Sequence, residues 1–264
     1  SDVCSSDLFR IDATLAATDQ NNKTVAFKAE GNKFDNEGDA EKFLNSCLGA
    51  SYKVKDIVVR PGKRTPAAPF TTSTLQQEAS RKLGYSVART MQLAQKLYES
   101  GKITYMRTDS VNLSDTAMQD ITKAIKENYG DAYLQIRKFK NKNESAQEAH
   151  EAIRPTYMQN SSVADNETYK LYELIWKRTI ASQMSDAALE KTTALIEIST
   201  NREILQASGE VIKFDGFLKI YLEGNDEEEE TEEEGESRLP NMQIGQVLDF
   251  RQMLATQKFS RPPA

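Results

Sequence analysis

The sequence is poor in the residues that build disulfide frameworks, metal sites and membrane spans. Its 264 residues include two cysteines, Cys4 and Cys47, and one histidine, His150. Two cysteines cannot form a disulfide framework or a cysteine-rich zinc site, and one histidine excludes any site that needs two. No stretch approaches the roughly 20 apolar residues that span a bilayer, and no signal-peptide pattern opens the chain. These absences predict a cytoplasmic protein that does not enter a membrane.

The net charge of −6 hides an uneven distribution. Residues 226–236 carry nine acidic and no basic side chains, and without them the formal charge would be +3. Residues 51–157 hold 18 Lys and Arg against 11 Asp and Glu, which is compatible with a phosphate-rich partner. The acidic run lacks the ligand spacing of a calcium loop. It predicts a solvated insertion, and the alternative is a segment that repels or mimics DNA.

The hydrophobic pattern changes from β to helical and back along the chain. Strands are predicted where apolar residues alternate, at 9–17, 24–29, 52–59, 192–199, 203–214, 217–223 and 245–259. Helices are predicted at 40–48, 75–83, 86–100, 115–129 and 166–184. The proline-rich segment 60–69 predicts an end of regular structure, and Thr72 or Ser73 can cap the helix that follows.

This order predicts a multidomain α and β protein, in which an inserted helical domain interrupts a β-rich domain built from both chain ends. The expected β-rich domain comprises residues 1–64 and 191–264, with an acidic loop at 224–238. The expected helical domain comprises residues 65–190. Its first two helices, joined by a short turn at Gly84, resemble a helix-turn-helix unit.

The segment GKITYMRTDSVNLS (101–114) carries the most informative side chains. If its centre is an extended strand, Tyr105 and Arg107 point to the same face. A tyrosine ordinarily has a pKa of about 10, so its hydroxyl needs a nearby cation or base to act as a nucleophile. Arg107 can hold a phosphate and stabilise the charge of a transition state. A purely structural pair in a strand is the alternative.

A second candidate segment, EAHEAIRP (148–155), surrounds the histidine and predicts a short helical turn ended by Pro155. His150 can hydrogen-bond a phosphate or assist proton transfer, or it can be structural. Arg154 would share its face in a helix and add a second phosphate contact. The alternative for Arg154 is an ion pair with Glu151 or Glu148.

The segment ITYMRTDSVNLS closely resembles the active-site tyrosine segment of bacterial type IA DNA topoisomerases. The resemblance runs from about Asp35 to Ala264, whereas the residues up to Leu8 do not match. Other segments agree with that family in order and spacing: APFTTSTLQQEAS, RKLGYSVARTMQLAQKLYESG, KNESAQEAHEAIRPT, LYELIWKRTIASQM, FDGFLKIY and KFSRPPA.

This resemblance implies an isomerase that relaxes negatively supercoiled DNA by transient single-strand cleavage, strand passage and religation without ATP. Tyr105 would be the nucleophile that forms a 5′-phosphotyrosine bond, and Arg107 would stabilise the pentacovalent phosphate. His150 would contact the phosphate. Supporting roles fall to Asp109, which would orient Arg107, to Gln95 and Arg154 as strand contacts, and to Thr108 and Ser110 as structural residues or phosphate donors.

The family's Toprim domain, which supplies the Mg²⁺ ligands and a catalytic Glu and Lys, has no match here, and the chain ends before the family's Gly-Arg-Pro-Ser-Thr segment. The resemblance therefore implies a central fragment made of the β arch and the tyrosine domain, with no metal site of its own. It implies a monomer near the nucleoid that prefers single-stranded DNA and uses no nucleotide cofactor. The fragment alone is expected to be inactive.

Two other classes stay open from the residues themselves. One is a non-catalytic helix-turn-helix module that binds DNA. The other is a tyrosine recombinase-like enzyme, which also uses Tyr and Arg but forms a 3′ link. Recombinases need several basic residues around the tyrosine from the same domain, and that constellation is missing from this sequence.

Deleting residues 224–238 should leave the melting temperature of the chain nearly unchanged, because a run of like charges repels itself and offers no core. Thermal unfolding of the deletion variant beside the intact chain measures this. A large drop in melting temperature would show that the acidic segment is packed.

Overall fold

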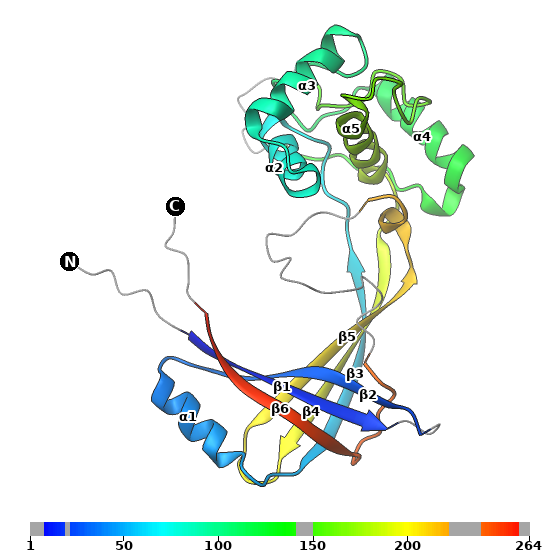
Figure 1. Ribbon diagram of the computed structural model, residues 1–264. Coiled ribbons are helices and arrows are strands. Elements are labelled where there is room, and N and C mark those ends of the chain that lie inside the picture. The colour runs from blue at the N-terminus through cyan, green and yellow to red at the C-terminus, as the bar shows by residue number, and fades with distance from the viewer. Residues whose placement is uncertain (1–7, 19–21, 141–149, 222–238, 259–264) are drawn as a thin grey trace, which may run out of the picture. The chain divides into compact units, whose positions relative to one another are not determined.

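The computed structural model describes residues 8–18, 22–140, 150–221 and 239–258 (Figure 1). The chain divides into two compact units, each made from segments distant in sequence. One unit combines Ser1–Gly62, Leu189–Ile212 and Glu234–Ala264, and the other combines Lys63–Ala188 and Lys213–Glu233. The acidic loop predicted at 224–238 lies outside the described residues.

A closed six-stranded barrel forms the first unit, in the order β1-β2-β5-β4-β3-β6. The strands are β1 (Leu8–Thr18), β2 (Thr24–Phe34), β3 (Tyr52–Arg64), β4 (Ala187–Ile198), β5 (Ile204–Phe214) and β6 (Val247–Lys258). β1 pairs antiparallel with β2 and also with β6, from Leu8↔Lys258 to Ala16↔Asp249. The chain is therefore a mixed α and β protein with an antiparallel sheet closed by its two ends.

The predicted alternation of β1 is confirmed, since Ile11, Ala13 and Leu15 are all buried in the barrel core. Helix α1 (Glu37–Ser46) adds Phe43 to this core, with its ring centroid 5.5 Å from that of Phe34. The helix starts earlier than predicted because the Asn36 side chain caps it, accepting the backbone N–H of Asp39 at 2.9 Å.

Four helices make up most of the second unit: α2 (Thr72–Leu83), α3 (Val87–Glu99), α4 (Asp115–Tyr129) and α5 (Tyr169–Ser182). The predicted helices are confirmed, and Gly84 ends α2 in the left-handed region with φ 66°. The predicted cap of α2 is wrong. Thr71 caps the helix in a capping box with Thr74, so that Thr72 is the first helical residue.

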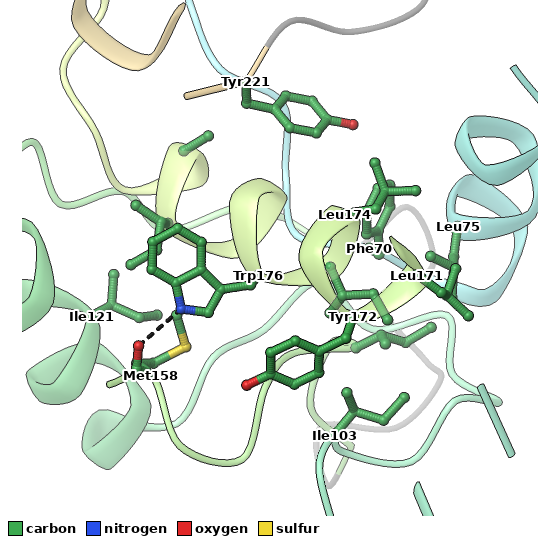
Figure 2. Close-up of a cluster of buried hydrophobic side chains, with 14 of the residues drawn as sticks. Phe70, Leu75, Ile103, Ile121, Met158, Leu171, Tyr172, Leu174, Trp176 and Tyr221 are labelled. Carbon is green, nitrogen blue, oxygen red and sulfur yellow. Dashed lines mark hydrogen bonds between the residues drawn. The ribbon is translucent and has the colours of Figure 1, made fainter. Parts of the chain in front are cut away.

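Helix α5 forms the centre of this unit (Figure 2). Ten of its 14 residues are buried, because α2, α3 and α4 all contact it. Trp176 fills the core and donates its indole N–H to the carbonyl oxygen of Met158 at 2.9 Å. Burial raises the pKa of Tyr172, also on α5, to about 12.

A buried polar network fixes α2 against α5. The Tyr221 hydroxyl donates to Glu78 on α2 at 2.8 Å, and Arg178 on α5 donates to the Tyr221 oxygen at 3.2 Å. The Nε of Arg178 also donates to the carbonyl of Ala68 at 2.6 Å. Burial raises the pKa of Tyr221, so its hydroxyl keeps the proton that it donates to Glu78.

Two predicted strand bounds differ from the structure. The strand β3 runs past the predicted end at residue 59, through Pro61 to Arg64, and regular structure then ends within the proline-rich segment 60–69 as predicted. Of the predicted strand 217–223, residues 217–219 belong to the 3₁₀ helix η2 (Gly216–Lys219), and residues 220 and 221 follow it without strand structure. Phe217 and Tyr221 are both buried in the core of the second unit.

Candidate active site

The centre of the tyrosine segment, residues 103–108, is not the extended strand that was expected. Only Ile103 forms a bridge, with Pro155, and the following residues are irregular. The alternation of burial nevertheless survives. Met106, Thr108 and Ser110 are at most 5% exposed, whereas Tyr105 is 43% exposed. Arg107 and Asp109 are also exposed. Tyr105, Arg107 and Asp109 therefore project into solvent from alternate positions, and the buried residues at the other positions anchor the segment.

Backbone hydrogen bonds hold the start of this segment against residues 152–156. Thr104 donates its N–H to the carbonyl of Arg154 at 2.9 Å and its hydroxyl to the carbonyl of Ala152 at 2.7 Å. The Arg154 N–H returns a bond to the Thr104 hydroxyl at 3.0 Å. Since an irregular buried backbone must find partners outside a ladder, these bonds fix the residue before Tyr105.

The end of the segment is held by the first turn of α2. Thr72 donates its backbone N–H to the carbonyl of Thr108 at 2.9 Å, and its hydroxyl bonds to groups of Met106 and Thr108. Further on, the Thr108 hydroxyl accepts the N–H of Ser110 at 3.0 Å. Thr108 and Ser110 therefore have internal structural bonds.

The ring of Tyr105 contacts the ring of Tyr98, the penultimate residue of α3. Their centroids are 5.3 Å apart in an edge-to-face arrangement with an interplanar angle of 67°. Such a pair has a preferred geometry, so it restricts the direction of the Tyr105 phenol. Gln95 lies one helical turn before Tyr98, is half-buried, and donates to Glu99 at 2.6 Å.

The predicted helical turn around the histidine is wrong for residues 150–155, and residues 148 and 149 lie outside the described part. The chain is extended there, because Ile153 bridges with Phe70 and the N–H of Ala152 donates to Asn112 at 2.8 Å. His150 lies two residues before Ala152, whose carbonyl accepts the hydroxyl of Thr104. Its side chain is exposed.

Arg154 forms the ion pair that was the alternative interpretation. Its guanidinium donates to Glu151 at 2.7 Å and to the carbonyl of Pro155 at 2.9 Å, and its side chain is 12% exposed. Glu151 also accepts the N–H of Ser114, the N-cap of α4, at 2.6 Å. Burial acts to raise the pKa of Glu151, but the bonds from Arg154 and Ser114 outweigh it and lower that pKa.

Sequence reasoning missed three residues that hold the site: Thr72, Thr104 and Tyr98. Their partners lie on other elements, and Thr72 bonds to residues 34 and 36 positions away. A local sequence pattern carries no signal for such bonds. For Tyr98, the one available signal was an aromatic residue at an exposed position of a helix in the basic segment 51–157.

The described residues offer no metal site, since no group of three or more His, Cys, Asp or Glu among them could hold an ion. The helices described are also all too short or too polar to cross a membrane.

Comparisons with known proteins agree on one family. A family model described as DNA topoisomerase matches residues 3–264. The chain is 42% identical over 228 residues to DNA topoisomerase 1 of Zymomonas mobilis, covering 85% of this chain and 19% of the relative. It is 44% identical over 243 residues to DNA topoisomerase 1 of Rickettsia felis, covering 86% and 31%.

A solved structure, full-length topoisomerase I of Thermotoga maritima, matches with a TM-score of 0.71 and 28% identity. The match covers 99% of this chain and 42% of that protein. The chain thus spans less than half of the relatives that it resembles.

Replacing Glu151 with Gln should destabilise the chain by about 1 kcal/mol at pH 7, because a charged hydrogen-bond acceptor becomes neutral. A carboxyl whose pKa is lowered by folding stabilises the protein above its unfolded pKa of about 4.3, and this stabilisation is lost as the pH falls through the folded pKa. Urea unfolding of both proteins should therefore give a difference that shrinks below about pH 4. The exposed Glu41, replaced in the same way, is the control. A difference that does not change with pH would contradict the assignment.

Proposed function

This chain belongs to the DNA topoisomerase family, and on that basis we propose that it is the central, tyrosine-bearing part of a type IA enzyme. In this proposal the whole protein relaxes negatively supercoiled DNA without ATP, through a covalent bond between Tyr105 and a 5′ phosphate. The observation that carries the proposal is the exposure of Tyr105, Arg107 and Asp109 from a segment whose alternate side chains are buried.

The proposed reaction is a transesterification. The Tyr105 oxygen attacks the phosphorus, loses its proton, and forms a phosphotyrosine bond, while the bond to the 3′ oxygen breaks and that oxygen gains a proton. Arg107 stabilises the additional negative charge on the five-coordinate phosphate, and His150 contacts the phosphate. Asp109 orients Arg107. Because one phosphodiester replaces another, religation is the reverse step and needs no nucleotide.

The barrel unit corresponds to an arch and the helical unit to the tyrosine domain, with α2 and α3 resembling a helix-turn-helix pair. Gln95, one turn from Tyr98 on α3, lies on the element that would line the strand. The substrate is single-stranded DNA in the cytoplasm, bound by a monomer. The family's Mg²⁺ would be held by residues outside this chain, and no step here is assigned to it.

In the whole protein, Tyr105→Phe should abolish the covalent adduct and leave binding of single-stranded DNA within about twofold. The change removes one hydroxyl and keeps the ring that contacts Tyr98, so the fold has no reason to change. The adduct is measured by trapping an end-labelled oligonucleotide under denaturing conditions.

The polarity of the trapped bond separates the competing classes. A tyrosine joined to a 5′ phosphate supports the proposal, whereas a tyrosine joined to a 3′ phosphate would favour a recombinase-like enzyme. An adduct that persists in Tyr105→Phe would show that another residue is the nucleophile.

The isolated chain should bind a single strand weakly and in a salt-dependent way. Each phosphate neutralised on a single strand contributes about 0.7 to the slope of log K against log salt, so three or four contacts give roughly −2 to −3. Fluorescence anisotropy with a labelled single strand, beside a duplex of equal length, measures this. A slope near zero would mean that the basic segment is ordinary surface, and a duplex preference would favour a helix-turn-helix module.

A further inference from the structure

We infer that Thr72 is a positioning residue, whose hydroxyl sets the direction in which Arg107 leaves the backbone. This inference deepens the proposed function, because it depends on Arg107 acting on the phosphate beside Tyr105. Thr72 itself is only partly buried, and it belongs to the first turn of α2.

The two peptide groups on either side of Arg107 are both bound by this one hydroxyl. The Thr72 oxygen donates to the carbonyl of Met106 at 2.8 Å, and it accepts the N–H of Thr108 at 2.8 Å. The carbonyl belongs to the peptide bond before Arg107 and the N–H to the peptide bond after it. Holding both peptide planes restricts the φ and ψ of Arg107, and so the direction of its side chain.

The single hydroxyl proton is directed to Met106. The Thr108 carbonyl lies further away, at 3.2 Å, and already accepts the backbone N–H of Thr72 at 2.9 Å. The Thr72 hydroxyl therefore donates one hydrogen bond, to Met106, and accepts one, from Thr108. A valine at this position has the same shape but no hydroxyl, so the substitution removes both bonds at once.

The anchor itself is held firmly. Helix α2 is fixed through its Glu78, which accepts the hydroxyl of the buried Tyr221 at 2.8 Å. Met106 and Thr108 are 1% and 5% exposed, so their side chains resist rotation of the segment. A rigid helix thus supports an exposed arginine through a residue that never needs to contact DNA.

The test compares Thr72→Val with Thr74→Val in the whole protein. Thr74 has the same residue type in the same helical turn, but its hydroxyl bonds to Thr71 rather than to the tyrosine segment. We expect Thr72→Val to slow single-turnover cleavage of a single strand by roughly tenfold to a hundredfold, since small displacements of a catalytic group cost that much. Its affinity for the uncleaved strand should stay within about twofold.

Thr72→Ser keeps the hydroxyl and should cleave nearly as fast as the wild type, as should Thr74→Val. In an Arg107→Ala background, Thr72→Val should add little further loss, because its effect passes through Arg107. Thr72→Ala replaces Thr72→Val if the valine variant does not fold.

Equal cleavage by Thr72→Val and Thr74→Val, or the same loss with and without Arg107, would overturn the inference. Tyr105→Phe, measured in parallel, keeps the two levels apart. If that variant still traps DNA, the proposed function fails, whereas if only the threonine effect is missing, this inference alone fails.

Discussion

The pairing of β1 with β6 is the constraint on which the rest of the chain depends. Residues 8–16 find their partners at 249–258, so the barrel closes only after nearly the whole sequence is in place. A closed barrel leaves no edge strand that could pair with another chain. The helical segments between its strands must therefore bury their hydrophobic residues in a core of their own, and in the second unit that core surrounds α5.

Within that second unit, a helix buried nearly all round leaves its neighbours little freedom. α2, α3 and α4 all pack on α5, and Glu78, Tyr221 and Arg178 link α2 to α5 through a satisfied polar network. Such a network is costly when incomplete and specifies one arrangement when complete. The first turn of α2 is consequently a fixed point against which an irregular segment can be placed.

The candidate site shows how an irregular segment can be precise. It has no strand ladder beyond Ile103, yet Thr104 and Thr72 take up the backbone groups before and after its exposed residues. Buried side chains at alternate positions anchor the segment, and the exposed ones are free for chemistry. The Glu151–Arg154 pair, with the N-cap of α4, fixes the neighbouring segment that carries His150.

Features that depend on neighbours along the chain could be predicted from the sequence. Local spacing predicted the ends of α2 and α4 before Gly84 and Gly130, the alternation of β1, and a common face for Tyr105 and Arg107, both of which the structure leaves exposed. The motif around Tyr105 indicated the family. Three features depend on the fold: the extended path beside His150, the ion pair of Arg154, and the bonds of the Thr72 hydroxyl to the peptide groups on either side of Arg107. Those features join residues many positions apart or depend on which competing partner is nearer, and periodicity reports neither.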